Sequence, residues 1–301
     1  MKGSEAMKFV EAKSLVQSVN HGDHWFGVDY NMNLYRGCCH GCIYCDSRSD
    51  CYQVGDFDTV RAKKDTGRML QKELSKKRKK GVVGIGAMSD TYNPFEKQYE
   101  ITREALQILH KNYFGVCIET KSDLIVRDID VLKQIQEHSA VIVKLSVTTI
   151  QDDVSLLVEP HAPVSSKRLA AIKQLNEAGV YAGMLMMPLL PWIEDTEKNI
   201  VELVKAAHDA HVRFIYPSFG LTLRKGNREY FYEQLDQNFP GMRKRYERVY
   251  GEKYLCDSPN AKQLAAIFKR ECIRYGIPYK MKDIIKDYKA KYQKEEQLSL
   301  F

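Results

Sequence analysis

The chain has 301 residues, of which 44% are hydrophobic and 28% charged, and its net charge is +7. This composition is typical of a folded protein with a sizeable core, and no run of 18 or more apolar residues predicts a transmembrane helix. Because Lys2, Glu5 and Lys8 stand where a secretory signal needs apolar residues, we expect a cytoplasmic protein.

Short apolar runs alternate with longer amphipathic segments in chain order. The runs that predict strands are 28–35, 82–87, 115–120, 141–148, 180–187 and 212–217. The segments that predict helices are 61–80, 97–111, 123–137, 166–178 and 196–211. In 97–111, for example, Ile101, Ala105 and Ile108 recur at helical spacing. Six strand–helix alternations predict an α/β protein with parallel βαβ units, whose active site lies at the carboxyl ends of the strands.

The predicted organisation has four parts. They are a lead-in over 1–27, an α/β unit over 28–220, a helical extension over 221–294 and a flexible tail over 295–301. Within the extension, 280–294 reads as a basic helix. Met1–Ala6 stands apart as a segment ahead of a second possible start at Met7.

Cys38, Cys42 and Cys45 form the most informative motif. Their spacing, three residues and then two, lets one loop wrap three thiolates around an iron–sulfur cluster and leaves one iron without a protein ligand. An open iron can bind a substrate or cosubstrate, so the motif predicts chemistry at this loop.

Zinc is the main alternative for this motif. Structural zinc takes four protein ligands, usually as two pairs, and the Cys42–Cys45 pair would need Cys38 or Cys39 with His40 to complete a crowded site. No second pair follows, because the remaining cysteines after residue 51 are isolated. Disulfides are disfavoured by the adjacency of Cys38 and Cys39 and by the expected compartment.

The motif resembles that of the radical S-adenosylmethionine (SAM) superfamily, in which an aromatic residue such as Tyr44 precedes the last cysteine. The flanking runs 35–38, 40–42 and 44–45 resemble the spore photoproduct lyase-like branch, and the similarity extends over about 29–195. The resemblance implies a partial (β/α)6 TIM-like barrel with a helical C-terminal extension. It also implies a [4Fe–4S] cluster held by the three cysteines, with SAM cleaved reductively to a 5′-deoxyadenosyl radical.

The resemblance also implies SAM contacts at the strand ends. Ser89 corresponds to the residue that holds the SAM amino group, and Lys121 to the one that binds the carboxylate. Ser146 corresponds to a ribose contact, although a hydroxyl on an alternating strand explains it equally well. Gly183 fits a strand whose backbone passes close to adenosine. With Tyr44, these residues form the predicted cofactor site.

One departure from the branch concerns the hydrogen donor. Lyases that repair a thymine dimer place a cysteine shortly before the SAM-binding serine, whereas this chain has Ala87 and Met88 there. Thymine-dimer reversal by that route is therefore disfavoured. The catalytic residues beyond the cluster stay open, and the candidates are Cys117, Tyr92 and Glu159.

Basic runs suggest nucleic acid as the substrate, although such runs most often form solvated helix faces. The candidate phosphate contacts are Lys76, Lys77, Arg78, Lys79, Lys80, Arg243, Lys244 and Arg245. We therefore expect a radical SAM enzyme that repairs or modifies DNA. The alternatives are radical modification of RNA, a protein or a small molecule, and an iron–sulfur adaptor that binds nucleic acid without catalysis.

The tail ends in Gln297-Leu298-Ser299-Leu300-Phe301, which is similar to the motif by which bacterial proteins bind the DNA sliding clamp. In that mode Gln297 hydrogen-bonds while Leu298, Leu300 and Phe301 supply apolar contacts. The alternative is that the terminal side chains fold back onto the barrel. The expected partners are thus DNA, the sliding clamp and a flavodoxin- or ferredoxin-like electron donor, with no membrane.

Overall fold

The computed structural model describes residues 7–19 and 25–292. Its main sheet has the strand order β10-β9-β8-β7-β6-β3-β2, in which β2 pairs antiparallel and the other strands run parallel. The strands are β2 Val16–Ser18, β3 Tyr30–Met32, β6 Val82–Ile85, β7 Gly115–Thr120, β8 Val141–Ser146, β9 Ala182–Met186 and β10 Ile215–Pro217. Six parallel strands in chain order confirm the predicted α/β partial barrel.

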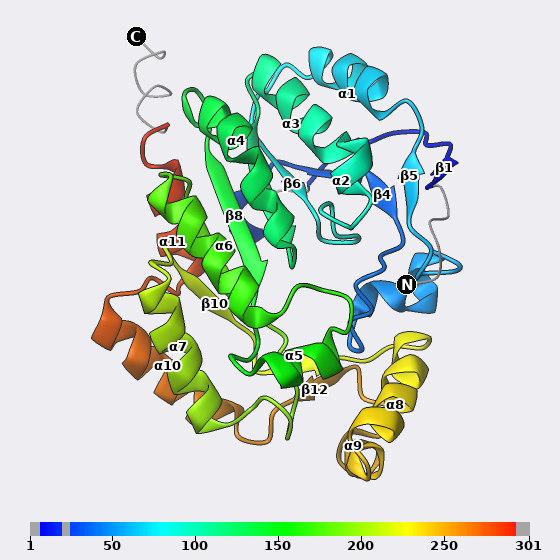
Figure 1. The fold of residues 1–301 in the computed structure, drawn as a ribbon, viewed down its shortest axis with the longest axis vertical. Helices are drawn as coiled ribbons and strands as arrows, with labels where there is room; N and C mark the ends of the chain where they lie inside the picture. Colours follow the sequence, from blue (N-terminus) through cyan, green and yellow to red (C-terminus); the bar gives the residue numbers. More distant parts are fainter. Residues whose placement is uncertain (1–6, 20–24, 293–301) are drawn as a thin grey trace.

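The helices of the α/β unit are α1 Thr66–Ser75, α2 Glu96–Tyr99, α3 Ile101–Lys111, α4 Ile129–Gln136, α5 Asp152–Val158, α6 Ser165–Glu177 and α7 Glu197–Asp209. Of these, α1, α3, α4, α6 and α7 pack on the outer face of the sheet, whereas α5 lies beyond the strand ends (Figure 1). The predicted helix 97–111 is interrupted at Glu100, whose φ of +49° places it in the left-handed region between α2 and α3. The segment 123–128 is a 3₁₀ helix that continues into α4.

The first predicted strand and the first predicted helix are wrong in part. Only Tyr30–Met32 joins the main sheet, while β4 Tyr35–Arg36 pairs with β5 Arg61–Lys63, and β5 also pairs with β1 Lys8–Val10. The residues of β5 belong to the segment predicted as helix. Ala62 is buried and its neighbours are half-exposed, which is the two-residue alternation of a strand.

The two faces of the main sheet have separate cores. Along β7, Val116 and Ile118 pack under the outer helices, whereas Cys117 faces the barrel interior. Phe26 and Phe214 fill that interior together with Ile284 and Tyr288 of α11, Met281–Lys289. The basic helix predicted over 280–294 therefore packs its apolar side against the inner face of the sheet.

The remaining C-terminal segment packs onto both the barrel and the cysteine loop. Its elements are β11 Gly220–Thr222, α8 Asn227–Asn238, α9 Met242–Tyr250, β12 Leu255–Asp257 and α10 Ala261–Tyr275. Helix α10 contacts α7 and contributes Phe268 to the outer core. Phe231 and Tyr246, from α8 and α9, share a core with Ile43 of the cysteine loop. Within residues 7–19 and 25–292, the helices are too short or too polar to cross a membrane.

Candidate active site

A cavity at the carboxyl ends of β6, β7 and β8 collects the predicted site residues. The three cysteine side chains reach it from the loop that follows β4, and Ser89, Lys121 and Ser146 reach it from the three strand ends. Six residues that lie far apart in the sequence thus line one cavity. The other lining residues are His40, Ser47, Gly86, Ala87, Met88, Asp90, Glu119 and Thr120.

The cysteines present three free thiols to this cavity. Burial raises the pKa of Cys42 to about 12, and it also raises the pKa values of Cys38 and Cys45. Soft thiolates are the ligands that iron–sulfur clusters take, so the donor set fits such a group and leaves one iron open. In the described ranges, no three Cys, His, Asp or Glu side chains are placed to hold a single metal ion.

Lys121 supplies the positive charge of the cavity. Its ammonium group lies 5.7 Å from the centre of the Tyr44 ring. Burial lowers the pKa of Lys121, but the negative charges of Cys42 and Glu159 outweigh that effect and raise it above its ordinary value. A permanently charged lysine at a strand end can bind a carboxylate.

Ser89 and Ser146 are both buried at the cavity wall. The Ser89 hydroxyl donates to the carbonyl of Gly37, the residue before Cys38. The Ser146 carbonyl accepts a bond of 2.7 Å from Arg168. Both residues therefore tie a strand end to a neighbouring segment and expose polar atoms to the cavity.

Asp90 organises the site, and sequence reasoning missed it. Its carboxylate accepts bonds from the Thr120 hydroxyl at 2.7 Å and the Lys121 amide at 2.8 Å, and it lies 3.3 Å from His40 Nδ1. Burial opposes its charge, but His40 and these donors lower the pKa of Asp90 to about 2. Asp90 thereby fixes the cysteine loop to the ends of β6 and β7. The only sequence signal is an acidic residue beside Ser89.

Glu159, a candidate catalytic residue, belongs to a buried network behind the cavity. It accepts hydrogen bonds from the Tyr44 hydroxyl and from the Arg168 guanidinium. Burial favours the neutral acid, but Arg168 and Lys121 outweigh it and lower the pKa of Glu159. The carboxylate thus holds Tyr44, and with it the cysteine loop, against α6.

The other candidates lie away from the cavity wall. The Tyr92 hydroxyl donates to Asp128 at 3.1 Å. Cys117 lies in the interior core, two residues before the cavity-lining Glu119. At Gly183 a side chain would meet the Phe214 ring at 2.4 Å, so packing alone requires glycine there. Any role of these residues in catalysis or SAM binding stays a prediction.

The predicted nucleic-acid residues fall on two separate surfaces. The run 76–80 follows α1 and precedes β6, so it lies at the amino ends of the strands, opposite the cavity. Lys77 and Lys80 cover the rings of Tyr30 and Phe114. The residues 243–245 lie on α9, where Arg243 pairs with Asp236 and Glu247. Only the α9 cluster is on the part of the protein that packs against the cysteine loop.

Comparison with known proteins agrees with this geometry. Residues 32–207 match the profile of the Radical SAM superfamily. An uncharacterized protein of Methanocaldococcus jannaschii is 32% identical over 71% of this chain and 78% of its own length. An uncharacterized protein of Mycobacterium tuberculosis is 28% identical over 73% of this chain and 67% of its own. The chain therefore belongs to the radical SAM superfamily.

Solved structures give the same fold. Spore photoproduct lyase complexed with dinucleoside spore photoproduct has a TM-score of 0.66 at 16% identity, covering 89% of this chain and 79% of that one. The radical SAM methyltransferase TsrM from Kitasatospora setae, with tryptophan and a SAM analogue bound, has a TM-score of 0.54 at 11% identity. The match covers 80% of this chain and 51% of TsrM. The chain is thus a radical SAM enzyme with the fold of spore photoproduct lyase. Membership of the superfamily implies a [4Fe–4S] cluster and SAM.

Proposed function

We propose that this protein uses a [4Fe–4S] cluster and SAM to repair or modify DNA by radical chemistry. When bound, the cluster would supply the electron for reductive cleavage of SAM to methionine and a 5′-deoxyadenosyl radical, which would abstract hydrogen from the substrate. Cys38, Cys42 and Cys45 would hold the cluster. Lys121 would bind the SAM carboxylate, while Ser89 and Ser146 would bind its amino and ribose groups.

The observation that carries the cofactor assignment is the common cavity of the three cysteines and the three strand-end residues. Each predicted role needs a different chemistry, namely soft sulfur, a fixed cation and hydroxyl oxygens. Asp90 and Glu159 position the loop and Tyr44 from behind, so the chain orients the cofactors through residues that do not react.

The DNA assignment rests on two further observations. The fold is that of spore photoproduct lyase, which is known in complex with dinucleoside spore photoproduct. The chain carries a net charge of +7, which favours a polyanionic partner. Ala87 and Met88 line the cavity where that lyase branch has its cysteine, so a reaction other than thymine-dimer reversal is favoured.

Product analysis in deuterium oxide tests this proposal. Reconstituted protein, SAM, a reductant and damaged DNA are incubated without oxygen, and the DNA is analysed by mass spectrometry. We expect SAM-dependent conversion of a damaged nucleotide, with deuterium incorporated if the quenching hydrogen exchanges with solvent. Conversion of RNA or a protein in place of DNA would favour the second hypothesis, and SAM left intact would favour the non-catalytic adaptor.

The tail adds a proposed partner, although it lies outside the described residues. We expect Gln297, Leu298, Leu300 and Phe301 to dock on the bacterial sliding clamp. Pull-down with the purified clamp should capture the full chain, whereas deletion of 297–301 should abolish capture. Capture that is indifferent to the deletion would refute the docking motif without affecting the cofactor assignment. A flavodoxin- or ferredoxin-like protein would supply the electrons.

A further inference from the structure

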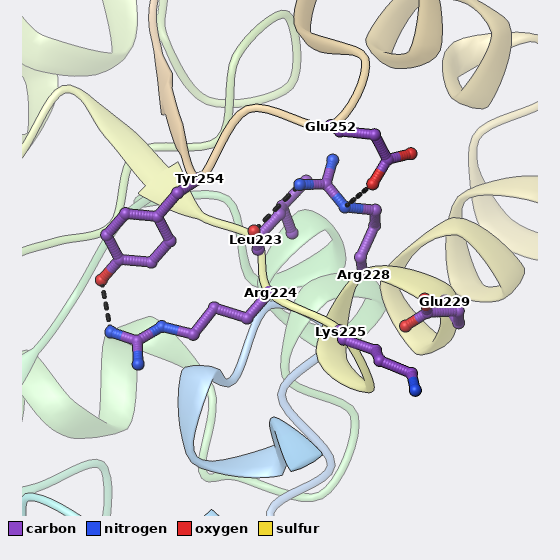
Figure 2. Close-up of a pocket in the computed structure, with 7 residues that line it drawn as sticks. All are labelled: Leu223, Arg224, Lys225, Arg228, Glu229, Glu252 and Tyr254. Atoms are coloured by element: carbon purple, nitrogen blue, oxygen red, sulfur yellow. Dashed lines mark hydrogen bonds and ion pairs between the residues drawn. The ribbon is translucent and has the colours of Figure 1, made fainter. Parts of the chain in front are cut away.

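A second pocket, of about 570 Å³, opens between α8 and β12 (Figure 2). It is formed by the loop that follows β11 and by the segment that precedes β12, and its charged groups are Arg224, Lys225, Arg228, Glu229 and Glu252. None of these residues belongs to the cofactor cavity.

Three of its charged side chains are engaged in the fold, and one of them is Glu252, which pairs with Arg228 at 3.7 Å (Figure 2). Arg228 donates to the carbonyls of Leu223, Gly251 and Lys253 and is almost fully buried. The Glu229 carboxylate accepts a hydrogen bond of 2.6 Å from the Gly226 amide. This carboxylate occupies the amino end of α8, where an anion would otherwise bind. These residues build the walls of the pocket, and binding a ligand falls to the side chains that remain exposed.

Arg224 and Tyr254 lie together at the exposed side of the pocket. Arg224 Nη2 donates to the Tyr254 hydroxyl at 2.6 Å, and the guanidinium carbon lies 4.6 Å from the ring centre. Tyr254 is 43% exposed although it is a large aromatic residue. Nucleobases stack on such aromatic rings and guanidinium planes.

Lys225 follows Arg224 in the chain, but its side chain extends away from Tyr254 (Figure 2), and it is the most loosely held cation of the pocket. Its side chain is 87% exposed, and among the described residues its ammonium group pairs with Asp50, at 3.9 Å. An ammonium held this loosely can exchange its partner for a phosphate at little cost. A base on Tyr254 and a phosphate further along the same strand would therefore meet different sides of the pocket (Figure 2).

The pocket is tied to the cluster loop. Arg224 Nε lies 3.4 Å from Asp46, the residue after Cys45, and the Thr222 hydroxyl donates to the same carboxylate at 3.2 Å. The Asp50 amide donates to the Lys225 carbonyl at 3.0 Å. A nucleotide in the pocket would therefore lie beside the loop that carries the metal ligands, on the same side as α9.

We propose that this pocket binds the DNA strand beside the reacting nucleotide. One base stacks on Tyr254 beside Arg224, and Lys225 contacts a phosphate further along the strand. This inference rests on the proposed DNA substrate and adds a docking position outside the cofactor cavity. Because stacking accepts every base, the pocket favours single-stranded or unpaired DNA and does not select a sequence.

Fluorescence anisotropy with a labelled single-stranded oligonucleotide tests the proposal on reconstituted enzyme with SAM. We expect Y254A to weaken binding about ten-fold, as loss of one stacked base does. Y254F keeps the ring and should bind nearly as wild type. We expect K225A to weaken binding a few-fold and to lower the slope of log affinity against log salt by about one. K173A, which removes an exposed lysine on α6, is the matched charge control.

Three outcomes separate the two proposals. Loss in Y254A and K225A but not in Y254F or K173A supports the subsite. Equal affinities of Y254A and wild type, or equal losses in K225A and K173A, would overturn it while leaving DNA as the substrate. Absence of DNA binding by the wild type would overturn both. Unchanged formation of 5′-deoxyadenosine by Y254A shows that the variant is folded and retains its cofactor site.

Discussion

Asp90 holds a charge in a place where burial opposes it, and its neighbours make that possible. The hydroxyl of Thr120, the amides of Tyr92 and Lys121 and the ring of His40 surround the carboxylate. These donors come from the cysteine loop and from two strand ends. The shape of the site therefore depends on a carboxylate that is held by the protein's own donors.

Comparing Cys42 with the nearby Cys39 tests which cysteines bind the cluster. Cys42 lines the cavity, whereas Cys39 packs against the outer core. We expect C42A to lower the iron bound after reconstitution by about ten-fold or more and C39A to leave it unchanged. Iron and acid-labile sulfide analysis measures this. Equal iron in both variants would contradict the assignment of the ligands.

Glu194 predicts a pH dependence of stability. Burial raises its pKa to about 8, despite hydrogen bonds from the Thr148 hydroxyl and the Leu190 amide. The unfolded carboxyl titrates near pH 4.3, so the folded state binds the extra proton between about pH 4.3 and 8. The stabilisation by this group is complete below that window and is lost as the pH rises through it.

The E194Q variant tests this dependence. Glutamine cannot ionise, so we expect the stability of the wild type relative to E194Q to fall by up to about 1.4 kcal/mol per pH unit across the window. Urea unfolding at pH 5 and pH 8 measures it. A constant difference between the two proteins would show that Glu194 is ionised throughout.

At the scale of elements, the central strands are predictable from the sequence and the short edge strands are not. The sequence predicts β7 with its observed bounds, because 115–120 is a short apolar run between two amphipathic helices. It predicts β5 as part of a helix, since three residues are too few to show a strand period against the helical pattern of α1. Short edge strands depend on pairing partners that are remote in sequence.

We expect substitution of Gly86, at the end of β6, to lower the stability of the fold strongly. Its φ is +100°, and an added Cβ would lie 1.9 Å from the Glu119 carbonyl oxygen. Gly179 also has a positive φ, of +85°, but no atom lies within 4 Å of the added Cβ. We expect G179A to cost about 1 kcal/mol through backbone strain alone.

G86A adds a clash with the backbone of β7, so we expect it to cost about 1–3 kcal/mol more than G179A. Chemical denaturation of both variants measures the difference. Equal losses of stability would mean that β6 and β7 can separate without cost, against the tight approach of the strands.

At the scale of the molecule, the sequence predicts the barrel and the residues that meet at its carboxyl ends. Parallel strands bring their ends to one edge, so the pattern predicts where the active site lies, whereas the choice of Ser89, Lys121 and Ser146 comes from the resemblance to the radical SAM superfamily. The pattern does not reveal Asp90 or the Glu159–Arg168 pair, because their roles depend on side-chain partners from separate elements. The sequence pattern predicts which strands and helices lie together. Which polar side chains form hydrogen bonds depends on how the folded elements pack.

The arrangement of the basic residues also emerges only from the whole molecule. The run 76–80 is the strongest phosphate-binding candidate by sequence, yet it lies at the strand edge opposite the cavity. Arg224 and Lys225 are inconspicuous in the sequence but pair with Asp46 and Asp50, which follow the cysteine loop. Charge runs identify a partner class, whereas the fold decides which charges can reach the site.

The central claim is that the cavity of Cys38, Cys42 and Cys45 cleaves SAM. The most direct test is to incubate reduced, reconstituted protein with SAM under anaerobic conditions and to measure 5′-deoxyadenosine by chromatography and mass spectrometry. The account predicts that wild type and C39A form 5′-deoxyadenosine and that C42A does not. Absence of 5′-deoxyadenosine from wild-type protein with a full complement of iron and sulfide would contradict it.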